Sequence, residues 1–448
     1  MAVAAVVGAL DLRGVTPQDL GAFLHGGSRL LAGADPYSPV ASPLFRSGHA
    51  FVYPVVAGWV LAPLSLLDRA VADGVFAAVS VVAILASCAL FGHRRPLEPA
   101  LILAASATVI ALQMGTLNAL LLLGLAVAWA GRDRAWMAGL AVAAVIVAKL
   151  FLLPALAWLV LTRRWRAAGV ALIATALALG AGFALGPLSL HQYSSMLSVL
   201  SRREAAEGWS LTGLAVNLGL PSTAAQGVAV VAGVGLLGAA AWQQRRHTDE
   251  RIVFAAAVVA ALLVTPILWS SYLVLLAAPL LLLSRRPVPL AVGCVVSWIL
   301  VIPDQVSTAL VLAGLAVAAV VVVAAAVVPV ASGSPPRPLT SLVPRGRRPS
   351  TPELLVATGA VVALALASPV VRSQLACVLA VLAAGAWALD LWPRPAWSTG
   401  GAARQGWRAT GGAARQGSQA TGGASRQGSR ATGGASRQGS QATPAAPG

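Results

Sequence analysis

Apolar runs separated by short arginine clusters occupy most of this sequence and limit what it can fold into. From Val75 to Trp392 the runs are roughly 15–24 residues long, close to the ~20 residues that a helix needs to cross a bilayer. Because lipid offers no hydrogen-bond partner to the backbone, such runs must form helices. The sequence therefore predicts an all-α, polytopic membrane protein.

The composition supports this prediction. Hydrophobic residues make up 58% of the 448 residues and charged residues 10%, against about 25% charged in an ordinary soluble domain. A net charge of +17 would suggest nucleic-acid binding in a soluble protein, but here the arginines cluster between apolar runs, as cytoplasmic loops do under the positive-inside rule. We therefore expect no nucleic-acid partner. The clusters are Arg94-Arg95, Arg132/Arg134, Arg163-Arg164/Arg166, Arg245-Arg246, Arg285-Arg286 and Arg345/Arg347-Arg348.

The arginine clusters also predict the topology. If each cluster lies in the cytoplasm, an even number of crossings separates it from the next, and the C-terminal tail is cytoplasmic. The runs on either side of Lys149 are short for full spans, so a thin hairpin is expected there. The predicted spans are Val75–Gly92, Pro99–Gln113, Leu117–Ala130, Ala135–Ala148, Leu150–Leu161, Ala167–Gly186, Ser222–Trp242, Ile252–Ile267, Leu268–Leu283, Val288–Ile302, Ala309–Val330, Glu353–Ser368 and Leu375–Leu391.

The sequence divides into segments of different composition. Its repeats of eleven residues at the end hold several glycines each and lack an apolar stripe, which is typical of disorder. Residues 1–10 are too short to span a membrane and suit a truncated first span better than a cleaved signal peptide. The expected division is 1–10, a truncated span; 11–74, an external loop with helices at the membrane surface; 75–331, the transmembrane core; 332–352, a basic cytoplasmic loop; 353–392, two further spans; and 393–448, a disordered cytoplasmic tail.

Phe51–Leu67 can be placed in two ways on its residues alone. As a full span it would leave the opening segment in the cytoplasm, and as a helix on the outer surface it would make residues 11–74 one external region. Pro54 and Pro63 suit an interfacial or re-entrant helix. The arginine count does not decide between the two placements.

The polar side chains before Phe51 belong either to a solvated loop or to a site. Gly26-Gly27, Gly33 and Asp35-Pro36-Tyr37 are turn and cap chemistry and predict the ends of two short helices. Leu20, Phe23 and Leu24 share one face of the first of them. This local order favours a site. The polar set comprises Asp11, Asp19, His25, Arg29, Asp35, Tyr37, Arg46 and His49.

Several motifs resemble glycosyltransferase family 87, the polyprenyl-phosphate-mannose-dependent mannosyltransferases of the GT-C class, which are typical of actinobacteria. The opening D-L-x-x-F-x-x-G-G-x-x-L-L-x-G-x-D-P-Y of residues 19–37, then F-x-Y-P and A-P-L-x-x-L, resemble the start of that family. The remaining matches are Gly115-Thr116-Leu117-Asn118 (G-Q-x-N), Ala148-Lys149 with Pro154 (A-x-K-x-x-P), Ser210-Leu211 (Q-S-L) and Thr265-Pro266-Ile267-Leu268-Trp269 (S-P-I-S-W).

The resemblance implies a GT-C-like helical bundle with juxtamembrane helices on the outer face, which would make residues 11–74 external. Two departures from the family pattern stand out. Thr116 replaces the glutamine of G-Q-x-N, and Ser270, Ser271 and Tyr272 follow Trp269 where the family usually runs on into one or two histidines. The second departure leaves three outcomes open: a changed acceptor, a base supplied elsewhere, or an inactive paralogue.

The implied reaction moves mannose or another hexose from a polyprenyl-phosphate donor to a glycolipid or glycan acceptor at the outer face of the plasma membrane, with inversion. The donor carries its own leaving group, so the lipid-linked sugar is a substrate and no cofactor is expected. A carboxylate can take the proton of the acceptor hydroxyl, and the family's catalytic aspartate maps onto Asp19. Asp35 is a weaker candidate, because it also suits a turn. The substrate-binding candidates are Lys149, Asp35, Tyr37, Asn118, Arg202, Arg203, Trp269 and Tyr272.

Lys149 is the one lysine of the chain and lies in the apolar stretch VIVAKLFLLP. Either it snorkels from a helix end to the interface, or it binds the donor phosphate, since ions inside a membrane usually serve a function. Arg202 and Arg203 are a second phosphate candidate, unless they pair with Glu204 and Glu207. The histidines have no spacing typical of metal ligands, so no metal site is expected.

A non-enzymatic membrane protein is the competing hypothesis, either a lipid-carrier transporter or a pseudoenzyme that assists glycan assembly in the cell envelope. The missing histidine supports it. A transporter would, however, distribute polar residues over facing spans near the midplane, whereas here the charges gather towards one face. The sequence therefore favours catalysis at the membrane surface.

Overall fold

A computed structural model of the chain describes residues 18–247, 249–283, 290–291, 293–294, 297 and 369–388. Every regular element in these residues is a helix, which confirms the predicted all-α class. By its internal contacts the chain divides into two units, Met1–Ser398 and Thr399–Gly448, and the described residues all belong to the first. The predictions for residues 1–17, the spans between residues 301 and 368, the basic loop and the repeat tail lie outside the described residues.

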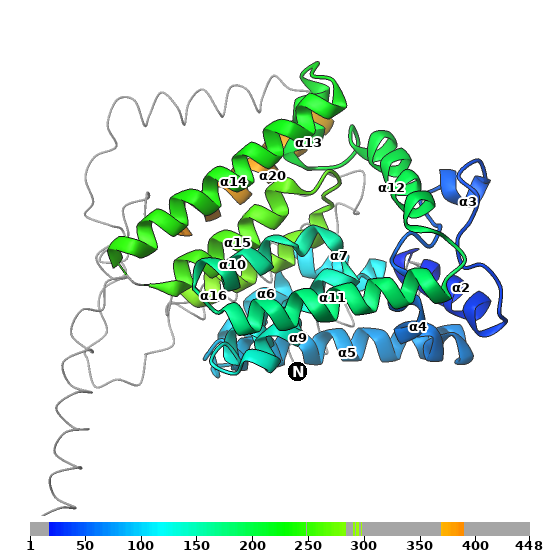
Figure 1. Cartoon of the computed structure of the whole chain (residues 1–448), viewed down its shortest axis with the longest axis horizontal. Coiled ribbons are helices and arrows are strands. Elements are labelled where there is room, and N and C mark those ends of the chain that lie inside the picture. Colours follow the sequence, from blue (N-terminus) through cyan, green and yellow to red (C-terminus); the bar gives the residue numbers. More distant parts are fainter. Residues whose placement is uncertain are drawn as a thin grey trace, which may run out of the picture. The chain divides into compact units, whose positions relative to one another are not determined.

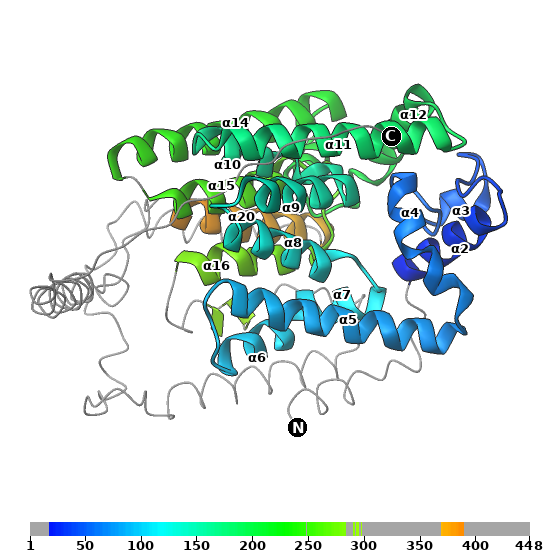
Figure 2. The ribbon, with the colours of Figure 1, turned by 60° about the horizontal axis from the view of Figure 1, so that its bottom comes forward.

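The helices run back and forth between two ends of the first unit (Figures 1 and 2). They are α2 (Gln18–Leu31), α3 (Pro43–Arg46), α4 (Val55–Leu61), η1 (Ala62–Leu66), α5 (Arg69–Leu90), α6 (Leu97–Ala104), α7 (Ser106–Met114), α8 (Asn118–Ala130), α9 (Ala135–Ala148), η2 (Leu150–Leu152), α10 (Pro154–Leu161), α11 (Trp165–Leu185), α12 (Leu190–Glu204), α13 (Leu211–Asn217), α14 (Ser222–His247), α15 (Glu250–Val264), η3 (Ser270–Leu276), α16 (Ala277–Leu283) and α20 (Pro369–Ala388).

Three described helices, α5, α11 and α14, are long and apolar enough to cross a membrane. The pair α6 and α7 adds a fourth if it counts as one span, broken by a bend of 64°. The other apolar helices are shorter: α9, with 14 residues, is ~21 Å long against the ~30 Å of a bilayer core. The predicted number of crossings therefore stays a prediction.

Large aliphatic side chains cover the outside of the long helices. In a soluble protein such a surface would be an anomaly, but it suits contact with lipid, where apolar side chains gain nothing from being buried. The chain is thus a polytopic helical membrane protein, as its composition predicted. On α11 the exposed aliphatic residues are Leu172, Ile173, Leu177 and Leu185, and on α14 they include Val228, Val230, Val231 and Val234.

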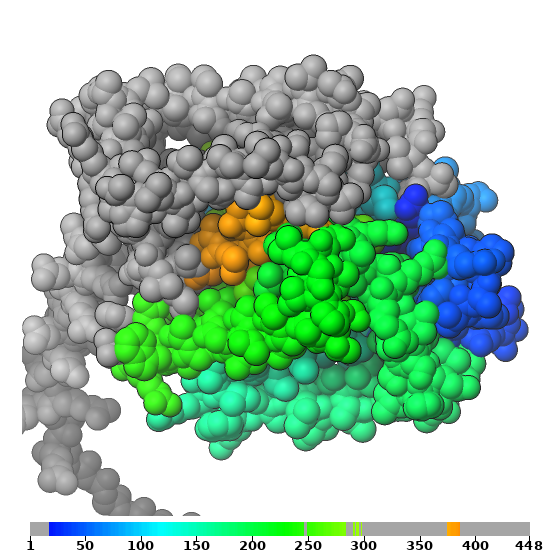
Figure 3. All heavy atoms as spheres, turned by 90° about the horizontal axis from the view of Figure 1, so that it is seen from above, coloured from blue at the N-terminus to red at the C-terminus, as the bar shows by residue number. Residues whose placement is uncertain are grey.

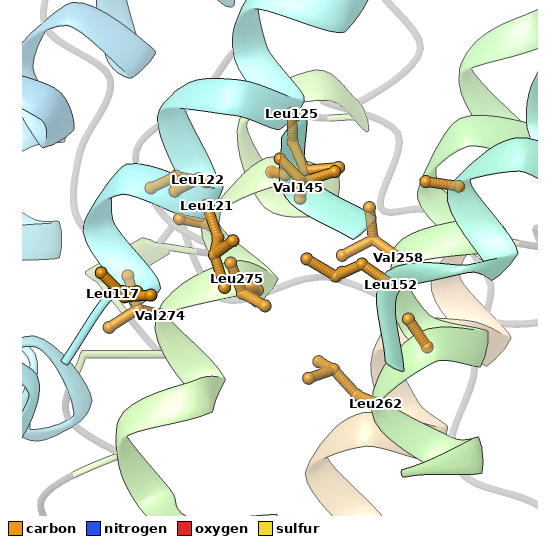
Figure 4. Packing of buried hydrophobic residues seen from close by; sticks show 14 of the residues in the cluster. Leu117, Leu121, Leu122, Leu125, Val145, Leu152, Val258, Leu262, Val274 and Leu275 are labelled. Carbon is orange, nitrogen blue, oxygen red and sulfur yellow. The ribbon is translucent and has the colours of Figure 1, made fainter. Parts of the chain in front are cut away.

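The core lies around α15, whose residues from Ile252 to Leu263 are all buried. The α15 helix packs against α10, α14 and α20, and α8 packs between α5 and α9. Figure 4 shows Leu121 of α8 beside Leu275 of η3, and Leu152 beside Val258 of α15. These contacts bring the start of α8, the end of α9 and the start of η3 to one place.

The arginine clusters at the ends of α8, α10 and α14 belong to one end of the unit. There, Arg132 Nε donates to Glu250 Oε1 at 2.8 Å, and Arg164 Nη2 donates to Glu250 Oε2 at 2.6 Å. This arginine end joins the loops before α9, α11 and α15. Because α8 and α9 are 13 and 14 residues long, Asn118 and Lys149 lie ~20 Å away, at the opposite end.

The opposite end carries α2, α3, α4 and α12 (Figures 1 and 2); we call it the loop end. Phe51–Leu67, which the sequence left as a span or a surface helix, contains only α4 and η1, which together run from Val55 to Leu66. This length is too short for a crossing by itself, since twelve helical residues extend ~18 Å. The proline at the start of α4 and Pro63 in η1 limit the helix on both sides.

The prediction of a turn at Gly26-Gly27 is wrong. Both glycines lie inside α2, with buried Leu20 and Phe23 on the predicted apolar face. They serve close packing instead: a Cβ at Gly26 would lie 2.8 Å from the Phe51 ring, and one at Gly27 would lie 2.8 Å from Ala62 Cα. Local sequence could not distinguish the two roles, because each needs a residue without a side chain.

Replacing Gly27 by valine should lower the free energy of unfolding by about 1–3 kcal/mol, as overpacking does, and should loosen α2 from η1. The measurements are the unfolding temperature in detergent and the rate of proteolysis within α2. Gly74→Val on α5 is the matched control, because no heavy atom lies within 4 Å of a Cβ at Gly74. Equal stability of the two variants would contradict the close contact.

Candidate functional site

The first turn of α2 places Asp19 at the loop end, partly buried. The Tyr53 hydroxyl donates to Asp19 Oδ2 at 3.5 Å. Burial raises the pKa of Asp19, while the positive charge of Lys149, the Tyr53 hydroxyl and His49 each lower it. The Asp19 carboxyl therefore lies near positive charge and is partly shielded from water, which suits a group that exchanges a proton.

Lys149 follows α9 in an extended conformation and is only 5% exposed. Its Nζ donates to Asn118 Oδ1 at 3.4 Å and lies 3.8 Å from the centre of the Tyr272 ring. Asn118 in turn donates from Nδ2 to Ser271 Oγ at 3.1 Å. An ammonium bonded inside the protein does not fit snorkelling to the interface. The binding of the donor phosphate by Lys149 stays a prediction.

Aromatic rings surround the two charged groups. Tyr272 stacks on Phe151, with ring centres 5.3 Å apart and an angle of 11°, and its ring also lies beside Lys149. Phe23 stacks on Tyr53 with ring centres 4.3 Å apart. Tyr272 is thus placed, where the family usually continues into histidines, as a cation–π partner of Lys149.

Two motifs far apart in the sequence meet beside this place. Trp209 N donates to Leu268 O at 2.6 Å, and Ser210 Oγ donates to Pro266 O at 2.7 Å. The loop before α13 therefore holds the Thr265–Trp269 segment that leads into η3. Trp269 itself is partly buried at the start of η3.

The same loop is anchored from behind by α20. Gln374, fully buried, donates from Nε2 to Ala206 O and Gly208 O, both at 2.8 Å, and accepts from Asn217 Nδ2 at 2.8 Å. Both N–H groups and the oxygen of this amide therefore have partners, as a buried polar group requires. The α20 helix thus supports the loop end although it comes last among the described elements.

Asp35 and Tyr37 have supporting positions. Asp35 is exposed, and its Oδ1 accepts from Tyr37 N at 2.8 Å, which is the turn contact that its sequence suggested. Tyr37 is buried, and its hydroxyl donates to Tyr53 O at 2.9 Å. Tyr37 therefore holds the backbone of the residue whose hydroxyl faces Asp19.

Arg202 and Arg203 lie at the exposed end of α12. Arg203 Nη2 donates to Arg46 O. Within the described part of the chain neither arginine forms an ion pair with a carboxylate, so the alternative pairing with Glu204 and Glu207 is not formed. Among the same residues, no group of three or more His, Cys, Asp or Glu side chains is placed to hold a metal ion.

Sequence reasoning missed three contributors. Tyr53 was only one letter of the F-x-Y-P motif, Ser271 was only a departure from a signature, and Glu204 was only a possible partner of an arginine. Burial, with Glu207 and Asp19 adding to it, raises the pKa of Glu204 to about 7. No local pattern marks these residues, since their roles depend on neighbours distant in sequence.

A buried ammonium and a partly buried carboxylate lie at one end of a helical membrane bundle. Residues 51–266, slightly less than half of the chain, match the model of glycosyltransferase family 87. The comparisons with curated proteins and with solved structures found no match. The matched segment contains Tyr53, Asn118, Lys149 and Glu204, and it indicates a membrane glycosyltransferase.

Proposed function

We propose that this protein transfers a hexose, most simply mannose, from a polyprenyl-phosphate donor to a hydroxyl of a glycolipid or glycan acceptor. The observation that carries the proposal is the placement of Asp19 and Lys149 at the same end of the bundle, both in contact with Tyr53. The family match over residues 51–266 supports the class of reaction, and the motifs at residues 19–37 extend the resemblance to Asp19.

The two charged groups have complementary tasks. Asp19 accepts the proton of the acceptor hydroxyl while the oxygen of that hydroxyl forms a bond to the sugar C1. The bond from C1 to the phosphate oxygen breaks, and the Lys149 ammonium stabilises the negative charge that the leaving phosphate gains. Attack opposite the leaving group inverts the configuration at C1. The reaction consumes no cofactor, since the donor already carries an activated sugar.

The test is transfer of labelled mannose from polyprenyl-phosphate mannose by membranes that contain the protein, compared with membranes that lack it. Polyprenyl-phosphate glucose in parallel decides which hexose is used. Loss of a specific mannosylated lipid on deletion would identify the acceptor. Normal glycan assembly by a protein that never consumes either donor would instead support the non-enzymatic hypothesis, in which the chain transports a lipid carrier or assists another enzyme.

We further propose that the loop end faces outwards at the plasma membrane and that the arginine end and the tail are cytoplasmic. A cysteine at Ala41, exposed beside α3, should react with an impermeant thiol reagent in intact cells. Cysteines at Arg95, exposed after α5, and at Ser429 in the tail should react only after permeabilisation. The native Cys88, Cys294 and Cys377 are buried and add little background. Labelling of Arg95→Cys in intact cells would reverse the orientation.

A further inference from the structure

Tyr53 lies between the two charged groups of the site. Its hydroxyl donates to Asp19 Oδ2 at 3.5 Å, and the centre of its ring lies 5.7 Å from Lys149 Nζ. Asp19 and Lys149 themselves form no ion pair within 4.0 Å in the described part of the chain. One side chain therefore contacts both groups, while no direct ion pair joins them.

The position of Tyr53 is held from several sides. Phe23 of α2 stacks on its ring, and Tyr37 donates to its backbone oxygen at 2.9 Å. The preceding residue is held as well, because the Tyr193 hydroxyl of α12 donates to Val52 O at 3.1 Å. Figure 3 shows α12 lying against the N-terminal segment on one face of the unit. Such support is what a side chain needs to keep two other groups in a set geometry.

The separation has a chemical consequence. If the Asp19 carboxylate and the Lys149 ammonium met directly, each would satisfy the other, and neither would be free for a proton or a phosphate. We propose that Tyr53 is a positioning residue that orients the Asp19 carboxylate and keeps it apart from Lys149, an inference that rests on the proposed transferase function. The Tyr53 hydroxyl orients the Asp19 carboxylate, and the Tyr53 ring lies beside the Lys149 ammonium.

The direction of the hydroxyl's effect follows from the proton that it donates. Hydrogen bonding to the ionised carboxylate lowers the pKa of Asp19, and a base works only above its own pKa. Loss of the hydroxyl should therefore move the acid limb of the activity profile to higher pH. Lys149 and His49 also lower the pKa of Asp19, Asp19 in turn raises the pKa of Glu204, and Arg69, which pairs with Asp73 at 2.9 Å, lies beside α2 at Gly21.

The experiment compares Tyr53→Phe, Tyr53→Leu and Tyr193→Phe in membranes with matched protein levels. Tyr53→Phe should slow transfer about two- to tenfold at acidic pH, which corresponds to one hydrogen bond of 0.5–1.5 kcal/mol, and should approach the wild-type rate at alkaline pH. Its KM for the polyprenyl-phosphate sugar should stay unchanged, because the ring remains beside Lys149. Tyr53→Leu should also raise that KM several-fold.

Tyr193→Phe is the control for indirect effects, since its hydroxyl donates to Val52 O and forms no hydrogen bond with Asp19 among the described residues. It should move the acid limb less than Tyr53→Phe does. A Tyr53→Phe rate lowered by one factor at every pH, or a shift of the acid limb as large in Tyr193→Phe as in Tyr53→Phe, would refute the positioning role while the transferase function stands. Equal transfer by wild-type protein and Asp19→Asn would refute the proposed mechanism itself, whatever the Tyr53 variants do.

Discussion

Asp19→Asn is expected to lower sugar transfer by roughly 10²–10⁴-fold, the usual effect of losing a general base, while the protein accumulates normally. Asparagine keeps the size of the side chain and can still accept a hydrogen bond from the Tyr53 hydroxyl, but it cannot take a proton. Since Asp19 is partly buried at the surface-facing turn of α2, the neutral amide should be tolerated there. The measurement is transfer from the lipid-linked donor by membranes with equal amounts of each protein.

Asp35→Asn is the control for this variant. Asp35 is exposed and its carboxylate accepts only the Tyr37 backbone N–H among the described contacts. An asparagine can keep that turn contact, so activity should fall little. If Asp19→Asn kept full activity, the base would have to be another group and the proposed mechanism would be wrong.

Lys149→Met should weaken use of the donor by about 10–100-fold in kcat/KM, the range expected for a charge-assisted contact worth 1.5–3 kcal/mol. Methionine matches the length of lysine and removes a buried charge, so the fold should not suffer from an unpaired ion. The loss should be specific to the phosphate-linked donor, because the ammonium stabilises the negative charge on the leaving phosphate. The measurement is the kinetics of transfer at varied donor concentration.

Lys149→Arg should restore part of the activity, because it returns the charge with a broader, planar head group. The ammonium now lies 3.8 Å from the Tyr272 ring and 3.4 Å from Asn118 Oδ1, and a guanidinium fits this narrow space less well. Unchanged kinetics in Lys149→Met would leave Lys149 as a structural cation that holds Asn118.

The breaks between helices show where local sequence predicts a turn correctly and where it does not. Gly115 lies between the predicted spans Pro99–Gln113 and Leu117–Ala130, and it ends α7 with a left-handed φ of 66°, which glycine adopts without strain. The helix break at Lys149 was also expected. At Gly26-Gly27 the same logic failed, since these glycines serve the approach of Phe51 and Ala62 to α2 rather than a turn.

For the candidate site, too, the sequence indicated some features and not others. Asp19, Lys149 and Asn118 stood out in the sequence, two by resemblance to a family and Lys149 as a lone cation in an apolar run. Their mutual contacts did not. Tyr53 and Ser271 entered the site only because α2, α8 and η3 begin where α9 ends, which follows from the packing of α8 against α9 and η3.

The sequence by itself determined the class of the protein, its helices and the end at which its arginines gather. These properties depend on local quantities, namely apolar length, backbone hydrogen bonding and charge near a bilayer. Only the tertiary structure decided that Asp19 and Lys149 share Tyr53, that Tyr272 faces the lysine and that Gln374 supports the loop before α13. Such contacts join residues from distant helices, so they depend on how side chains fit across helix surfaces, and that fit leaves no periodic mark in the sequence.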